Sequence, residues 1–251
     1  MNNISIDELK KFVNTNIDKF HSEKIARLSR LELREILKSK NPYLFKAKNL
    51  NTAADLINDL LAAFLSSSEE KLFGDFLEKL AIFISSKTYG GHKSSSTGVD
   101  LEFSIKDATY LVSVKSGSKW GNSTSKAKQN TDLQKALATV RQGNRSANVI
   151  PVIGMCYGHQ RTTTVKGILN ITGQNFWELI SGDENLYINI VEPIGYRAKE
   201  HNDNFLRERA RLMNIFTKQF IDGFCDDGII NWDKLVEFNS GNKIKSKQIS
   251  N

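Results

Sequence analysis

The segment from Gly98 to Gly121, GVDLEFSIKDATYLVSVKSGSKWG, constrains the fold of this chain more than any other part of it. Apolar residues recur at every second position from 99 to 103 and again from 110 to 114, with Lys106 and Asp107 between the two runs. A period of two is typical of half-buried strands, and a short polar turn between two such runs predicts an antiparallel hairpin. The chain therefore has to build a β-sheet around this hairpin.

The residues before the hairpin predict helices. Apolar residues recur at three- and four-residue steps up to about Ser68, with a break at Asn41-Pro42. A helix capped by Asn51 or Thr52 is expected to reach about residue 61, and another to run from near Ser68 to about residue 85.

The residues after the hairpin complete the sheet. We expect a helix over about 126–141, a central strand covered on both faces at VIPVIGMCYG, a strand at VKGILNI, a helix at QNFWELI and a long basic helix over about 204–223. This order predicts an α/β fold, a mixed β-sheet flanked by helices, to which residues 1–65 add an N-terminal helical layer. The core is expected to span 66–240, and the basic tail 241–251 to fray.

Composition narrows the class of protein. No apolar run approaches the ~20 residues that a membrane helix needs, and MNNISIDELKK is no signal peptide. Cys156 and Cys225 have no metal-ligand spacing, so we interpret them as reduced thiols of a cytoplasmic protein, buried for structural reasons. The net charge of +7 permits nucleic-acid binding without proving it.

The parity of the hairpin decides which side chains meet. If the turn holds two or four residues centred on Lys106-Asp107, Asp100 stands opposite Ser113, and Asp100, Glu102, Ser113 and Lys115 project from one face. Asp100 and Lys115 are then diagonal neighbours, about 7 Å apart at Cβ. A three-residue turn without a bulge would place them on opposite faces. The alternative is a solvent-facing strand with an ion pair worth ~0–1 kcal/mol.

A carboxylate beside a lysine suits the hydrolysis of a phosphodiester. Carboxylate oxygens bind hard divalent ions, and a nearby cation stabilises an attacking hydroxide. Two more carboxylates are candidates. Glu78 lies on a helix flank with small neighbours that let it approach the sheet, or it merely borders a buried face. Asp132 lies early in the next helix, where a solvated position is the alternative.

GVD followed by YLVSVKSG resembles the PD-(D/E)XK nuclease signature. From about residue 69 to 238 the chain is similar to type II restriction endonucleases, at KSGSKWGNS, GQNFWELISGDENLY, VEPIG and FCDDGIINWDKLVEF. The resemblance implies a restriction-endonuclease-like fold, with Asp100 as the metal-binding aspartate and Lys115 as the catalytic lysine. Glu78 matches the acidic residue often found on the helix before the hairpin.

The chain departs from the signature at two positions. Val99 replaces the proline, and Ser113 replaces the acidic residue of the (D/E)XK triplet. Some restriction enzymes with an SVK triplet take the missing carboxylate from the next helix, which favours Asp132, with Glu102 as the competing replacement. The expected catalytic set is Asp100, Lys115, Glu78 and Asp132, and the expected ligands of Mg²⁺ are Asp100, Asp132, Glu78 and Glu102.

The resemblance implies Mg²⁺-dependent cleavage of double-stranded DNA at a short sequence, leaving 5′-phosphates, and a cognate DNA methyltransferase as the functional counterpart. Cutting both strands needs two active sites, so we expect a homodimer, with residues 1–65 as a candidate interface. Gln160 suits adenine and Arg161 suits guanine, although an ordinary polar loop is the alternative there. The expected DNA contacts are Lys93, Lys119, Trp120, Asn122, Lys126, Lys128, Gln160 and Arg161.

Three other functions remain open from the sequence. The chain is alternatively a repair, nicking or modification-dependent nuclease of the same fold, a DNA-binding protein with a decayed site, or an interaction protein of the same architecture. Ser113 is the residue that suggests decay. Cutting of both strands at a defined sequence would distinguish a restriction enzyme from the other nucleases of this fold. A DNA-binding protein with a decayed site would show no Mg²⁺-dependent cleavage.

Overall fold

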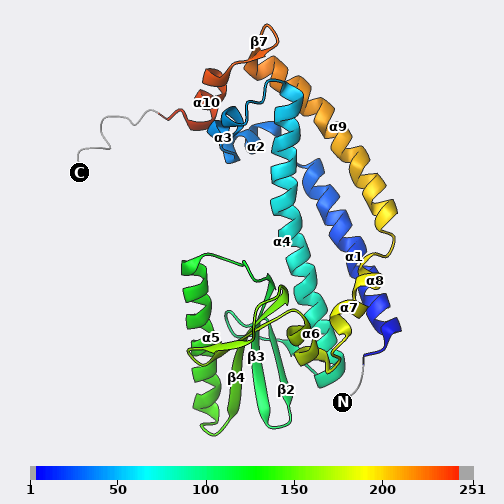
Figure 1. Cartoon of the computed structure of the whole chain (residues 1–251), viewed down its shortest axis with the longest axis vertical. Coiled ribbons are helices and arrows are strands. Elements are labelled where there is room, and N and C mark those ends of the chain that lie inside the picture. Colours follow the sequence, from blue (N-terminus) through cyan, green and yellow to red (C-terminus); the bar gives the residue numbers. More distant parts are fainter. Residues whose placement is uncertain (1–3, 243–251) are drawn as a thin grey trace, which may run out of the picture. The chain divides into compact units, whose positions relative to one another are not determined.

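A computed structural model describes residues 4–242 and groups them into two units. Unit 1 contains residues 4–20 and 71–197, and unit 2 contains residues 21–70 and 198–242. Two long helices, α1 (Ile6–Ser29) and α4 (Ala53–Tyr89), have residues in both units (Figure 1). Each unit has a hydrophobic core of its own.

Unit 1 is built on a six-stranded mixed sheet of order β1-β2-β3-β4-β6-β5. β1, β2 and β3 are antiparallel, β3, β4 and β6 are parallel, and β5 is antiparallel to β6. The strands are β1 (His92–Lys93), β2 (Leu101–Ile105), β3 (Ala108–Gly117), β4 (Asn148–Tyr157), β5 (Thr163–Val165) and β6 (Ile168–Thr172). The predicted fold class is confirmed, because helices flank both faces of this sheet.

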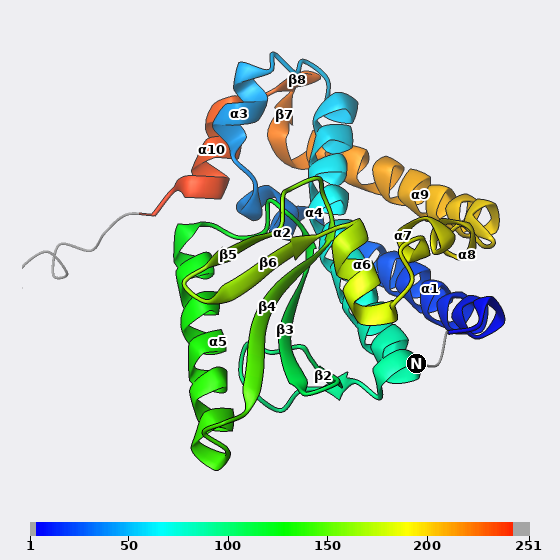
Figure 2. The same cartoon turned by 60° about the horizontal axis from the view of Figure 1, so that its bottom comes forward.

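The helix α5 (Ser123–Gly143) covers one face of the sheet (Figure 2). On that face Leu111, Ile153 and Met155 pack against Leu133 and Ala136 of α5. The other face carries residues 71–89 of α4, the start of α1, and α6 (Gln174–Ser181). Alternate residues of each strand reach opposite cores because strand side chains alternate between faces. Two short helices, α7 (Leu186–Asn189) and α8 (Val191–Ile194), follow α6.

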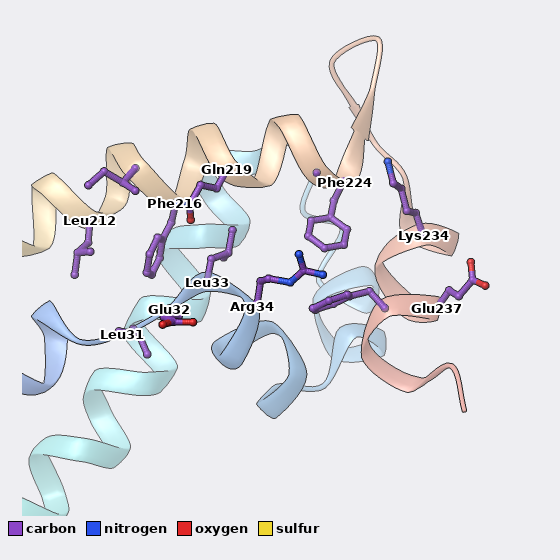
Figure 3. Close-up of a pocket in the computed structure, with 13 residues that line it drawn as sticks. Leu31, Glu32, Leu33, Arg34, Leu212, Phe216, Gln219, Phe224, Lys234 and Glu237 are labelled. Carbon is purple, nitrogen blue, oxygen red and sulfur yellow. The ribbon is translucent and has the colours of Figure 1, made fainter. Parts of the chain in front are cut away.

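Unit 2 packs the rest of α1 and α4 with α2 (Leu33–Ser39), α3 (Pro42–Ala47), α9 (Ala198–Phe224) and α10 (Trp232–Ser240). A small hairpin, β7 (Cys225–Asp226) and β8 (Ile229–Ile230), joins α9 to α10. A cavity of about 790 Å³ lies among α2, α9 and α10 (Figure 3). The Arg34 guanidinium carbon there is 4.9 Å from the centre of the Phe238 ring. None of the residues expected in a catalytic site lines it.

Two sequence predictions of local structure are wrong. The two helices expected around Ser68 are one helix, α4, within which the hydroxyl of Ser67 donates to the carbonyl of Ala63 (3.0 Å) instead of capping a new helix. VKGILNI is a hairpin rather than one strand, because Lys166 (φ 52°) and Gly167 (φ 75°) form a turn between β5 and β6. β4 has the central position expected of its apolar run.

The expected division into 1–65, 66–240 and 241–251 stays a prediction, and residues 243–251 of the tail lie outside the described part of the chain. Among residues 4–242, no helix combines the length and apolar character required to cross a membrane.

Candidate active site

The turn of the β2–β3 hairpin has two residues. Ile105 pairs with Ala108, and Lys106 takes a positive φ of 51° between them. Leu101 pairs with Val112, so one step further along the same register Asp100 stands opposite Ser113. The parity predicted from the sequence is therefore confirmed.

Asp100 is fixed by two hydrogen bonds from β3. Its Oδ2 accepts from the backbone N–H of Val114 (2.7 Å) and from the hydroxyl of Ser113 (3.2 Å). Within residues 4–242, no hydrogen bond reaches Oδ1. The half-buried carboxylate is thus held at one oxygen and open at the other.

Lys115 lies on the same face as Ser113, two residues further along β3. Its Nζ is 5.2 Å from the centre of the Trp120 ring, a distance at which a cation is attracted to the ring face. Within the described residues, this ammonium forms no ion pair. Its charge is therefore available to an anion placed beside Asp100.

Asp132 of α5 packs next to the segment that enters β2. A Cβ added to Gly98 would lie only 2.6 Å from the Cβ of Asp132, and Gln129 donates a hydrogen bond to the carbonyl of Gly98 (2.6 Å). Gly98 has a φ of +78° and precedes Asp100 by two residues. Asp132 and Asp100 consequently belong to the same, α5-covered side of the sheet.

Glu78 lies on the other side. It pairs with Lys93 (3.4 Å), and Lys93 is the strand partner of Leu101, whose side chain belongs to the core beneath α4. Burial, and secondly the charge of Glu78, raise the pKa of the Cys156 thiol in that core. Glu102 is on the Asp100 face by alternation and accepts a hydrogen bond from Ser94 (3.2 Å).

The carboxylates of the site differ in how well they suit a divalent ion. In the described part of the chain, no three His, Cys, Asp or Glu side chains gather as a ready metal cluster. Mg²⁺, however, is usually bound by one or two carboxylates together with waters and substrate phosphates rather than by a complete protein cage. The open Oδ1 of Asp100, with Asp132 on the same side, fits that requirement, while Glu78 faces Lys93.

The residues expected to contact DNA fall into three places. Trp120 and Lys126 lie beside Lys115, and the Nζ of Lys126 is 5.9 Å from the centre of the Trp120 ring. Asn122 caps α5 by accepting from the N–H of Ser125 (2.9 Å), and Lys119 and Lys128 are exposed near it. Lys93 is on the α4 side. Gln160 and Arg161 are exposed in the loop between β4 and β5, and they line a cavity together with Trp120 and Lys126.

Two features of the site have no signal in the sequence. The sequence marks Ser113 as a departure from the signature but gives it no role, whereas in the structure it is fully buried and its hydroxyl donates a hydrogen bond to Asp100. Asn130 and Asn170 line the cavity with Gln160 and Arg161, although they are far apart in the sequence. Their approach depends on β6 pairing with β4, an order of strands that no local pattern reveals.

No curated protein matches the chain significantly. Residues 7–202 match the family model described as type II restriction endonuclease EcoO109I. The match covers most of the chain, including the β2–β3 hairpin, α5 and the cavity beside them. The activity of this family is site-specific cleavage of DNA, and its members generally use a divalent metal ion. The chain belongs to the type II restriction endonuclease family.

Proposed function

We propose that this protein is a Mg²⁺-dependent endonuclease that hydrolyses both strands of DNA at a short specific sequence and leaves 5′-phosphates. The observation that carries the proposal is the common sheet face of Asp100 and Lys115, with Oδ1 of Asp100 open and the ammonium of Lys115 unpaired within the described residues. A phosphate placed between a bound cation and Lys115 meets positive charge from two directions.

We assign distinct roles to the residues around the phosphate. Asp100 offers Oδ1 to the ion, and the hydrogen bonds from Ser113 and Val114 keep the carboxylate from rotating. Asp132 offers a second carboxylate from α5, in place of the acidic residue missing at Ser113. Lys115 stabilises the attacking hydroxide and the charge that develops on the phosphoryl oxygens. When bound, Mg²⁺ supplies Lewis-acid polarisation and lowers the pKa of a water.

The Ser113 substitution does not by itself indicate a decayed site. A serine in this position still donates a hydrogen bond to Asp100, and an acidic residue on α5 lies on the same side of the sheet. The hydrogen bond leaves the metal-facing oxygen free. This arrangement favours an active enzyme over a DNA-binding protein that has lost its activity.

Digestion of unmethylated plasmid DNA tests the proposal. Wild-type protein with Mg²⁺ should yield discrete fragments whose ends ligate without prior kinase treatment, which shows 5′-phosphates. Asp100→Ala should yield none, and Asp107→Ala, in the exposed hairpin turn, should cut like the wild type. A wild-type protein that leaves the plasmid intact, or Asp100→Ala producing the same fragments, would overturn the proposal.

A further inference from the structure

A cavity of about 250 Å³ lies immediately beside the candidate active site. Its floor includes Ile153 and Met155 of β4, which are the direct strand partners of Ser113 and Lys115. Directly paired residues share a sheet face, and neighbouring strands are about 4.8 Å apart. The cavity therefore begins one strand away from the residues that we assign to the phosphate.

The row of paired residues continues across the sheet. Ile153 pairs with Asn170 of β6, and Asn170 pairs with Thr163 of β5, so all three side chains lie on the α5 face with Ser113. Asn170 is thus two strand spacings, roughly 10 Å, from Ser113. Such a separation is comparable to the step from one nucleotide of a DNA strand to the next or second next.

One wall of the cavity is the indole of Trp120. Lys115 Nζ and Lys126 Nζ lie 5.2 Å and 5.9 Å from the centre of this ring. An aromatic ring flanked by ammonium groups combines a stacking surface for a base with positive charge for the adjoining phosphates. The same residue therefore borders both the phosphate site and the cavity.

The remaining walls carry hydrogen-bonding groups. Asn130, Gln160 and Arg161 line the cavity, and within residues 4–242 their side chains form no hydrogen bond or ion pair. Asn170 donates its amide N–H to the carbonyl of Ile168 (3.1 Å), which leaves its carboxamide oxygen as an acceptor. Amides and a guanidinium are the groups that hydrogen-bond base edges.

The volume of the cavity limits the size of the ligand that it can hold. Pockets for drug-sized ligands hold ~300–1,000 Å³, so a cavity of about 250 Å³ suits a single ring system. A stacked, paired base presents only its groove edge and has no free ring face for Trp120. A base that leaves the stack exposes both its ring faces and its pairing edge.

We propose that this cavity receives one unstacked nucleobase of the bound DNA, with Trp120 against its ring and Asn130, Gln160, Arg161 and Asn170 around its edge. The proposal rests on the proposed function for the identity of the ligand as DNA. Gln160 and Arg161 then read an extruded base instead of the groove edge of a pair, and Trp120, Asn130 and Asn170 become specificity-determining residues.

Binding of synthetic duplexes in EDTA tests the proposal without cleavage. The probes are a duplex with one unpaired adenine at its centre, the same duplex with an unpaired abasic nucleotide, and the fully paired duplex. Fluorescence anisotropy should show the wild type binding the adenine duplex at least about fivefold more tightly than the abasic duplex. The abasic probe keeps the kink and the charge, so the ratio isolates the base.

Variants locate the effect. Trp120→Ala should abolish the preference for the adenine duplex, Trp120→Phe should retain most of it, and Asn170→Ala should reduce it. Tyr157→Ala removes an exposed aromatic ring of β4 that does not line the cavity, and should keep the wild-type ratio. Equal wild-type affinity for the adenine and abasic duplexes, or an unchanged ratio in Trp120→Ala, overturns the proposal.

The plasmid digestion separates this outcome from failure of the proposed function. Specific cleavage without base preference overturns the cavity assignment alone. A base preference that depends on Trp120, in a protein that does not cleave, overturns the nuclease assignment and leaves the cavity assignment standing. Absence of binding to all three duplexes contradicts both.

Discussion

At the scale of single residues, the hydrogen bond between Ser113 and Asp100 fixes the orientation of the carboxylate in the candidate site. The hydroxyl of Ser113 occupies the place where the signature expects a carboxylate, and it donates to Asp100. An acidic residue there would repel Asp100 until a cation arrived, whereas the serine orients Asp100 in the absence of one. We therefore expect the second carboxylate of the proposed metal site to come from elsewhere in unit 1.

Three carboxylates compete for that role, and they differ in where they lie. Asp132→Asn should raise the Mg²⁺ concentration for half-maximal cleavage at least about tenfold, because it removes the charge of the carboxylate that we propose as a ligand on the Asp100 side. Glu102→Gln should have a smaller effect, and Glu78→Gln should change it little, because Glu78 faces Lys93 on the α4 side. Rates measured across a Mg²⁺ titration rank them. A larger shift for Glu78→Gln than for Asp132→Asn would contradict the assignment.

The buried thiol of Cys156 should make the free energy of unfolding depend on pH in the alkaline range. Burial, and then the charge of Glu78, raise its pKa above the ordinary value of 9.0, so the folded thiol stays neutral while the unfolded thiol ionises. The unfolded state gains free energy from ionisation as pH rises above about 9, and stability falls by up to ~1.4 kcal/mol per pH unit. Below pH 8 this group has no effect on the pH dependence.

Urea unfolding at pH 8 and pH 10 measures this effect. The tryptophan fluorescence includes Trp177, whose ring N–H donates to the carbonyl of Cys156 (2.8 Å). The urea concentration at the unfolding midpoint should be lower at pH 10 than at pH 8 in the wild type. The difference between the two pH values should be smaller in Cys156→Ala. An equal fall in both proteins would show that this thiol does not ionise on unfolding in the expected range.

At the scale of elements, α5 packs closely against Gly98, just before β2, and this packing holds Asp132 on the Asp100 side of the sheet. Gly98 and Gly167 both have a positive φ, +78° and +75°, but only Gly98 has no room for a Cβ, since Asp132 lies in its path. Gly98→Ala should thus destabilise unit 1 by about 1–3 kcal/mol more than Gly167→Ala, which has open space. Thermal or urea unfolding compares the two. Equal losses would mean that α5 does not pack tightly on Gly98.

The elements that the sequence predicts well are those with local signals. The two-residue turn at Lys106-Asp107 follows from two alternating runs, and the buried central strand β4 from an unbroken apolar run. The polar residues near Ser68 predict the start of a new helix, but no proline or glycine interrupts α4 there, and its apolar spacing continues through Leu65 and Leu72. Local polarity alone does not end a helix.

The elements that the sequence could not predict depend on long-range order. The cavity beside Lys115 exists because β6 crosses over to pair with β4, which brings Asn170 next to Ile153. Likewise, unit 2 contains residues 21–70 and residues 198–242, and no local sequence pattern in either segment indicates that the two pack together. Similarly, the helical periodicity around Glu78 does not show on which side of the sheet Glu78 lies. That side became clear only from its ion pair with Lys93 and from the core beneath α4.

At the scale of the whole molecule, cleavage of two antiparallel strands needs two sites related by a two-fold axis. Sedimentation equilibrium of the wild type should accordingly give about twice the chain mass of 28.3 kDa at the concentrations at which it cuts plasmid. Linear product should form with little nicked intermediate. A mass of one chain together with fast cutting of both strands would contradict the expected homodimer.

The central claim is that Asp100 and Lys115 act on one phosphate. Single-turnover cleavage rates in Mg²⁺ should be compared for the wild type, Asp100→Asn, Lys115→Gln and the double variant. Asp107→Asn and Lys106→Gln, the same residue types in the exposed turn of the same hairpin, serve as controls. We predict that each site variant loses at least about 10²-fold in rate, that the double variant is little slower than the worse single variant, and that both controls keep the wild-type rate. Cleavage by either site variant at close to the wild-type rate would contradict the account.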